Sequence, residues 1–245
     1  MSEIGLYNPD GFAFQKNAAQ PVVDSSLIMW LDARIRASYQ YGATTWFDLS
    51  GNRNHGTLSN ATYGTEDKGR IVFNGTSTLV TYPAIVFTNA PFTLEFFGSI
   101  NGLLDSLNRR GIFGFNSNAS ELSNSYAFLL QFIGDGVLQT FNFGIASDPY
   151  QFPSFQYFHW VFTIDVSRIT TVYVNGLKNP SQNQLSSFTN ITMSFNRFGL
   201  SLSASNRYYV GNLLTARIYS RALSVSEVQQ NFNSLSNRLN KYTQQ

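Results

Sequence analysis

The sequence predicts a single antiparallel all-β domain with one short helix near its end. Three observations support this prediction. Apolar and polar residues alternate in short runs, Asn-Gly and Asp-Gly pairs separate the runs, and a helical pattern occurs only near the C-terminus. The chain has 245 residues and no cysteine, so its hydrophobic core, and not disulfides, must hold the fold together.

Period-two alternation marks the strands that are expected to build the core. It occurs over residues 92–96, 138–145 and 160–165, where the apolar side chains share one face because successive side chains of a strand point in opposite directions. Residues 168–176 form a β-branched run that ends in Asn-Gly, a strong signal for a type I′ hairpin turn. These features favour antiparallel hairpins over the alternating strands and helices of a parallel sheet.

The expected helix begins at a capping box. Ser224 can accept a hydrogen bond from the backbone of Glu227, whose side chain can reach back to the backbone of Ser224. The residues that follow predict an amphipathic helix packed on the sandwich, with this apolar stripe: Val225, Val228, Phe232, Leu235 and Leu239.

We expect three segments: an arm at residues 1–24, a sandwich domain at residues 25–238 and a tail at residues 239–245. The arm has turn signals without sustained periodicity, so it is a partner-binding extension, a flexible terminus or a first edge strand. The sequence shows neither a signal-peptide pattern nor an apolar stretch of spanning length. We therefore expect no classical export signal and no membrane insertion.

The surface is expected to be polar but nearly uncharged. The net charge is +2, and only 12% of the residues are charged. The basic residues are scattered, whereas a nucleic-acid partner would require a clustered basic face, so none is expected. Uncharged polar side chains must cover the surface instead, which suits contact with sugars or dense packing among copies.

Three ordered stretches carry a family pattern. Residues 46–56 read Trp-Phe-Asp-Leu-Ser-Gly-Asn-Arg-Asn-His-Gly after an apolar strand, residues 69–75 read Gly-Arg-Ile-Val-Phe-Asn-Gly, and residues 216–224 read Ala-Arg-Ile-Tyr-Ser-Arg-Ala-Leu-Ser. Together they resemble the concanavalin A-like lectin/glucanase superfamily, in particular its laminin G-like branch. The resemblance covers residues 26–236 and implies an antiparallel jelly-roll β-sandwich.

The resemblance also bears on function. The loop at residues 46–56 is similar to versions found in structural proteins of tailed bacteriophages and environmental viruses. This similarity implies a non-enzymatic virion structural or decoration protein on the surface of a phage-like capsid or tail, made in the host cytoplasm. Its expected partners are other virion proteins or copies of itself, together with host surface glycans. The alternatives are a free, lectin-like carbohydrate-binding module and a glycoside hydrolase.

The carboxylates argue against the hydrolase. A glycosidase needs two carboxyl groups on opposite sides of the scissile bond. Here Glu95 stands alone in its run, Glu66 and Asp67 are adjacent and point to opposite faces, and Asp165 ends a strand. One of the two histidines, His159, lies within a strand and is expected to pack there. We therefore predict that the protein is not an enzyme.

Sugar binding would use flat aromatic faces beside amide and hydroxyl groups. The candidates lie in loop-like stretches or in the Asn-rich loop: Tyr39, Tyr41, Tyr150, Phe152, Asn54 and His55.

Calcium is the one metal that the loop suggests. Members of this superfamily often bind it through loop oxygens, and Asp48, Ser50, Asn52 and Asn54 offer hard oxygen ligands. The alternative is that these side chains form Asx-turns, which fold such a loop without an ion.

Overall fold

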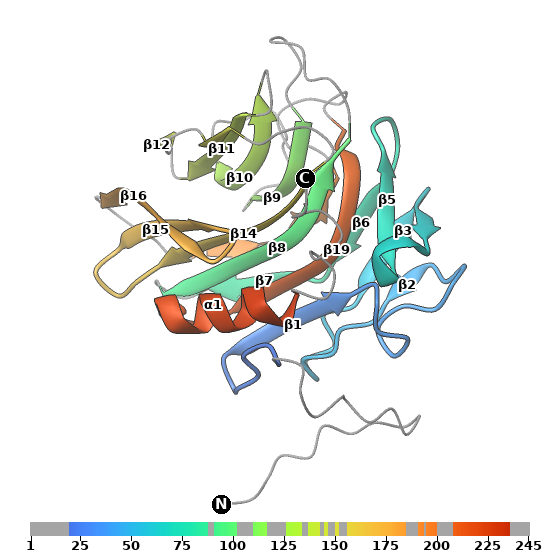
Figure 1. Ribbon diagram of the computed structural model, residues 1–245, viewed down its shortest axis with the longest axis horizontal. Helices are drawn as coiled ribbons and strands as arrows, with labels where there is room; N and C mark the ends of the chain where they lie inside the picture. Colours follow the sequence, from blue (N-terminus) through green and yellow to red (C-terminus); the bar gives the residue numbers. More distant parts are fainter. Residues whose placement is uncertain are drawn as a thin grey trace, which may run out of the picture.

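The structure is a computed structural model. It describes residues 20–87, 91–101, 110–116, 126–133, 137–142, 145–146, 150–151, 156–184, 191–193, 195–199 and 208–235. Within this part of the chain two antiparallel sheets form a jelly-roll sandwich (Figure 1).

The first sheet, sheet A, has the strand order β16 (Leu177–Gln184), β15 (Ile169–Val174), β14 (Tyr157–Ile164), β8 (Phe92–Ile100), β19 (Val210–Tyr219), β5 (Arg70–Asn74) and β4 (Thr62–Gly64), and β1 (Leu27–Asp32) also pairs with β19. The second, sheet B, has the order β12 (Ile145–Ala146), β11 (Val137–Asn142), β10 (Tyr126–Ile133), β9 (Arg110–Asn116), β18 (Phe195–Phe198), β6 (Leu79–Tyr82), β3 (Gly56–Ser59) and β2 (Thr45–Trp46), and β13 (Tyr150–Gln151) also pairs with β11. A separate pair joins β7 (Ile85–Phe87) to β17 (Ile191–Met193).

Most of the predicted elements are confirmed. The runs at residues 92–96 and 160–165 lie in β8 and β14, and the Asn-Gly pair that follows β15 has positive φ at both residues, 50° and 77°, as a type I′ turn requires. The run at residues 138–145 is different. It divides into β11 and β12, which pair with each other, so the chain reverses where the alternation suggested one continuous strand.

The predicted helix is also confirmed, although Val225, the first residue of its predicted packed stripe, is 42% exposed. Helix α1 (Val225–Ser234) starts at Ser224 with both hydrogen bonds of the capping box. Leu239, the last member of the predicted stripe, lies outside the described residues. A short 3₁₀ helix, η1 (Glu66–Lys68), precedes β5.

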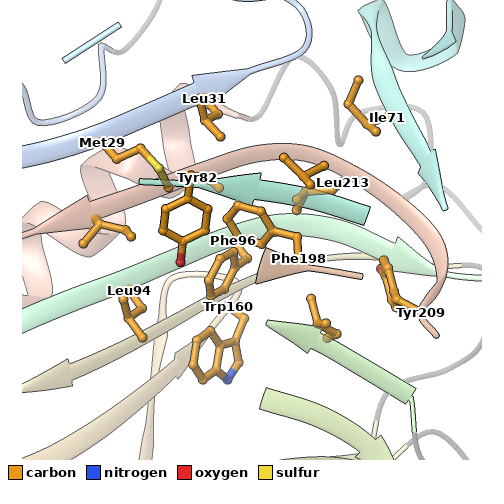
Figure 2. Close-up of a cluster of buried hydrophobic side chains, with 14 of the residues drawn as sticks. Met29, Leu31, Ile71, Tyr82, Leu94, Phe96, Trp160, Phe198, Tyr209 and Leu213 are labelled. Atoms are coloured by element: carbon orange, nitrogen blue, oxygen red, sulfur yellow. The ribbon is translucent and has the colours of Figure 1, made fainter. Parts of the chain in front are cut away.

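The main core lies between the two sheets (Figure 2). Trp160 on β14 is 1% exposed, and its ring stacks with those of Phe96 at 5.7 Å and Phe162 at 6.1 Å. Sheet B closes the core from the other side through buried residues such as Tyr82 and Phe198. The alternating aromatic residues of the sequence are thus the core of the sandwich, as predicted.

The outer face of sheet A is also covered. Helix α1 lies against it, and Val228 of the helix and Leu235, which follows its last turn, join two smaller apolar clusters with residues of β8, β14 and β19. Residues on this face therefore lie in a second, partly polar core beneath the helix.

Candidate functional site

Two tyrosines from one loop occupy opposite environments. Tyr39 is 6% exposed, its ring stacks on Tyr63 at 5.1 Å, and its hydroxyl donates to the carbonyl of Ala43 at 3.1 Å. Tyr41 is 81% exposed and meets Tyr63 edge-on at 6.0 Å. Of these two among the four predicted sugar-stacking rings, only Tyr41 is therefore accessible, and Tyr39 packs behind it against Tyr63.

A tight turn places Tyr41 at the tip of its loop. The backbone N–H of Ala43 donates to the carbonyl of Gln40 at 2.9 Å, and Gly42 has a φ of 79°. A type II turn needs this left-handed conformation at its third residue, and glycine adopts it without strain. The glycine at position 42 thus allows the turn that places Tyr41 at the loop tip.

The structure does not describe the side chains of the other two aromatic candidates. Tyr150 begins β13, and its side chain lies outside the described part. Phe152 lies outside the described residues altogether. Their assignment to a binding site stays a prediction.

Asp48 is the centre of the Asn-rich loop. It is 8% exposed, and its Oδ1 accepts the backbone N–H groups of Trp30 at 2.8 Å and Ser50 at 2.9 Å. Its Oδ2 accepts the hydroxyl of Ser50 at 2.7 Å and the backbone N–H of Asn54 at 2.9 Å. Each carboxylate oxygen thus faces two hydrogen-bond donors from the protein.

The other polar side chains of the loop bind strand β1. The amide nitrogens of Asn52 and Asn54 donate to the carbonyl of Ile28 at 3.2 and 2.9 Å, and the hydroxyl oxygen of Ser50 lies 2.8 Å from the same carbonyl oxygen. Asn52 also donates to the carbonyl of Leu27 at 2.9 Å. These side chains act in place of a neighbouring strand, and we call residues 48–54 the edge cap.

This arrangement does not fit a calcium ion. Calcium requires oxygen atoms that converge on one point, whereas the oxygens of Asp48 face N–H and O–H donors and the two asparagines present their nitrogens. Across the part of the chain that the structure describes, no group of three or more His, Cys, Asp or Glu residues could hold a metal ion. Hydrogen bonds of the kind found in Asx-turns hold this loop.

His55 takes part in the same loop. Its Nδ1 accepts the backbone N–H of Asp48 at 3.0 Å, and its ring meets that of Phe47 edge-on at 5.2 Å. Phe47 is 39% exposed, so this half-buried histidine lies beside a second accessible ring.

A charged cluster lies beneath helix α1, and sequence reasoning did not find it. Glu95 on β8 is 1% exposed, and its Oε1 accepts from Arg217 Nη1 at 2.7 Å and is 2.8 Å from His159 Nε2. Its Oε2 accepts from the Asn231 amide at 2.7 Å. The guanidinium of Arg217 also lies over the ring of Trp30, 5.5 Å from its centre. The one available signal was a charged residue in the middle of an otherwise apolar run.

The electrostatics of the cluster favour a buried ion pair. Burial by itself raises the pKa of Glu95, but the charge of Arg217 and the hydrogen bonds from His159 and Asn231 outweigh it and lower the pKa below its ordinary value. Burial by itself lowers the pKa of Arg217, but the nearby negative charge of Glu95 outweighs burial and raises the pKa above its ordinary value. Because Glu95, His159 and Arg217 are at most 1% exposed, no substrate reaches them, and the cluster is structural.

A second polar cluster joins η1 to β14. The hydroxyl of Tyr157 and Nη1 of Arg70 both donate to Oδ2 of Asp67, which is 6% exposed and has a φ of 57°. Burial first, and then the neighbouring Asp67, raise the pKa of the Tyr157 phenol well above its ordinary value. The phenol is therefore protonated at neutral pH, which is the opposite of an activated tyrosine nucleophile.

Comparison with known proteins identifies the fold. Residues 74–229 match a family model of the concanavalin A-like lectin/glucanases superfamily. No curated protein sequence matches the chain. Among the described residues, no helix is long and apolar enough to cross a membrane.

Three solved structures illustrate the likeness. Trypanosoma rangeli sialidase in complex with sialic acid is 18% identical with a TM-score of 0.67, over 87% of this chain and 33% of the sialidase chain. The receptor binding domain of botulinum neurotoxin type G is 13% identical with a TM-score of 0.63, over 85% of this chain and 51% of that one. The binding domain of Paraclostridial mosquitocidal protein 1 is 19% identical with a TM-score of 0.64, over 85% and 52%.

At these identities the likeness establishes the fold and leaves the activity open. The chain spans about a third of the sialidase and about half of the two toxin chains. The family model, in contrast, matches well over half of the sequence. The chain therefore belongs to the concanavalin A-like lectin/glucanases superfamily.

Proposed function

We propose that this protein is a non-catalytic glycan-binding module. The observation that carries the proposal is Tyr41, a ring that is 81% exposed and is held by Tyr63 and a tight turn. An aromatic face stacks on the apolar face of a sugar ring, and the turn fixes the backbone from which this ring projects. Gln40 and Thr44, both exposed, supply uncharged polar groups beside it.

Two buried carboxylates support the absence of catalysis. Glu95 is buried and occupied by three partners, and Asp67 is buried with Tyr157 and Arg70. A glycosidase needs a carboxyl pair that reaches substrate. The sialidase likeness covers a third of that enzyme, so it supports a shared fold more than a shared reaction.

A glycan array tests the role of Tyr41. The full-length chain should bind a subset of glycans, and Tyr41→Ala should weaken that binding about tenfold or more, since the loss of about 1.4 kcal/mol corresponds to tenfold in Kd. Its free energy of unfolding should stay within about 0.5 kcal/mol of the wild type, because the ring is exposed.

Phe47→Ala is the matched control, because it removes another accessible ring from a neighbouring loop. Tyr41→Trp should retain binding. Undiminished binding by Tyr41→Ala, or no glycan bound by the wild type, would exclude this site.

The module's setting is the second part of the proposal: display on the surface of a phage-like virion, in contact with other virion proteins or with copies of itself. The resemblance of the loop at residues 46–56 and the low content of charged residues, 12%, support it. Cryo-electron microscopy of the native source particle should show ordered copies on its shell or tail. A particle without this chain would contradict the setting and leave the glycan site untouched.

A further inference from the structure

The exposed ring of Tyr41 lies against a second tyrosine, Tyr63, which is held both by its ring and by its hydroxyl group. The ring of Tyr63 meets Tyr41 edge-on at 6.0 Å and stacks on the buried Tyr39 at 5.1 Å. Its hydroxyl group donates to the backbone carbonyl of Ala33 at 3.3 Å. The direction of the Tyr41 ring therefore depends on where Tyr63 lies.

Gly69, in the loop between β4 and β5, lies directly against the hydroxyl group of Tyr63. Its φ and ψ are 118° and 130°, a conformation that residues with a side chain rarely adopt. A Cβ atom added to Gly69 would lie 2.5 Å from the hydroxyl oxygen of Tyr63 and 2.5 Å from the carbonyl oxygen of Ala33. Both distances are well inside van der Waals contact, so the hydrogen bond between Tyr63 and Ala33 has room only because position 69 lacks a side chain.

The loop that carries Gly69 is tied to the body of sheet A. The carboxylate of Asp67, which is 6% exposed, accepts hydrogen bonds from Arg70 on β5 at 3.0 Å and from Tyr157 on β14. The backbone N–H of Gly69 donates to the carbonyl of Glu66 at 3.0 Å. The loop therefore cannot move away from the tyrosine hydroxyl group without breaking these hydrogen bonds.

Ala33 is fixed as well. It is 1% exposed, and its backbone N–H donates to the carbonyl of Leu214 at 2.9 Å. The side chain of Tyr63 is only half-buried, so of the groups around Gly69 it has the most room to move. A side chain at position 69 would therefore displace the ring of Tyr63, and with it the support of Tyr41.

We infer that Gly69 is a positioning residue of the Tyr41 site, which acts through Tyr63 to set the direction in which Tyr41 presents its ring. The binding surface is then built by two loops, residues 38–47 and residues 65–69. The role in glycan binding rests on the function proposed above, whereas the positioning of Tyr41 depends on no ligand.

Aromatic NMR signals of the full-length chain test the position of Tyr41, because the ring current of a neighbouring aromatic ring shifts the signals of ring protons. Gly69→Ala should move the signals of Tyr41 and Tyr63 relative to the wild type, since the added methyl group displaces Tyr63. A folded Gly69→Ala chain in which the signals of Tyr41 stay in place would overturn the inference.

Gly199→Ala is the matched control. Gly199 also has a positive φ, 99°, and an added Cβ would lie 2.5 Å from the carbonyl oxygen of Thr78 and 2.6 Å from the ring of Phe73. This variant introduces the same kinds of backbone strain and close contact beside other residues. It should leave the signals of Tyr41 unchanged. If they move as far as in Gly69→Ala, the effect is a general loosening of the fold and the specific role of Gly69 is overturned.

Tyr63→Phe tests the same contact without adding an atom. It removes the hydroxyl oxygen that the added Cβ would meet, so in the double variant with Gly69→Ala the signals of Tyr41 should return toward those of Tyr63→Phe alone. Residues in direct contact show such non-additive effects, and additive shifts would contradict the contact. If Gly69→Ala does not fold, Tyr63→Phe decides: loss of the bond to Ala33 should move the signals of Tyr41, and unmoved signals would overturn the inference.

The glycan array described above measures the consequence for binding. Gly69→Ala should weaken the binding of the glycans that the wild type recognises by at least about threefold, as expected for coupled neighbouring residues, and Gly199→Ala should bind as the wild type does. A displaced Tyr41 with undiminished binding would overturn the role of Gly69 in recognition. A wild type that binds no glycan would contradict the proposed function alone, because the NMR signals still decide whether Gly69 positions Tyr41.

Discussion

Replacement of Glu95 by alanine should lower the free energy of unfolding by about 3–5 kcal/mol, the usual cost of removing one partner from a buried ion pair. The substitution leaves the charge of Arg217 buried without its counter-ion and removes the acceptor that Asn231 and His159 share. In a chain of this size each kcal/mol corresponds to about 2–4 °C in Tm. Urea and thermal unfolding would measure the loss.

Glu66→Gln provides the comparison. Glu66 also pairs with an arginine, Arg70 at 3.1 Å, but its side chain is 63% exposed. Its loss should change the stability by about 1 kcal/mol or less. If Glu95→Ala lowers the free energy of unfolding no more than Glu66→Gln does, the buried cluster does not stabilise the packing of helix α1 on sheet A, which its geometry indicates.

Acid should remove part of the same stability. A carboxyl group with a lowered pKa binds fewer protons in the folded than in the unfolded chain, so its contribution is present above the unfolded pKa and is lost as the pH falls through the folded pKa. Glu95 is such a group. Glu227 is another, because its hydrogen bonds with Arg221 lower its pKa from 4.5 to about 2. Urea unfolding should show stability falling between pH 4.5 and 2, less steeply in Glu95→Ala.

The second largest effect is expected from Asp48→Ala, at about 2–4 kcal/mol. The carboxylate satisfies four donors, and each buried donor left unpaired costs about 1–3 kcal/mol. The backbone N–H of Trp30 belongs to a residue that is only 2% exposed, so the loss of its acceptor is expected to make up the largest part of the cost. Chemical denaturation of the purified variant would measure the effect.

Asp165→Ala tests whether the loss of stability depends on the number of hydrogen bonds that the carboxylate accepts. Asp165 also closes a loop, but its side chain accepts one bond, from the backbone N–H of Ile169 at 2.9 Å. Its loss should cost about 0.5–1.5 kcal/mol. Equal losses in the two variants would show that the edge cap is not the source of the larger effect.

Local patterns predicted the elements well. Alternation found β8 and β14, and the capping box found α1, because each depends on residues close together in the sequence. The same information could not separate Tyr39 from Tyr41. They lie two residues apart in one polar stretch, and the contact with Tyr63 on β4 decides which of the two is buried.

The site residues depend on contacts between distant parts of the chain. Glu95 looked isolated because its partners His159, Arg217 and Asn231 lie 64, 122 and 136 residues away. The edge cap had the opposite difficulty. Its oxygen-rich sequence matched calcium chemistry, and only the position of β1 showed which atoms those side chains face.

The edge cap has a consequence for how copies of this protein can be crowded together. A strand edge with unpaired N–H and C=O groups is a template on which another chain can add a strand, and repetition of that step produces fibres. Asp48, Ser50, Asn52 and Asn54 occupy those groups on residues 27, 28 and 30 of β1. Densely packed molecules can therefore touch along this side without their sheets merging into a filament.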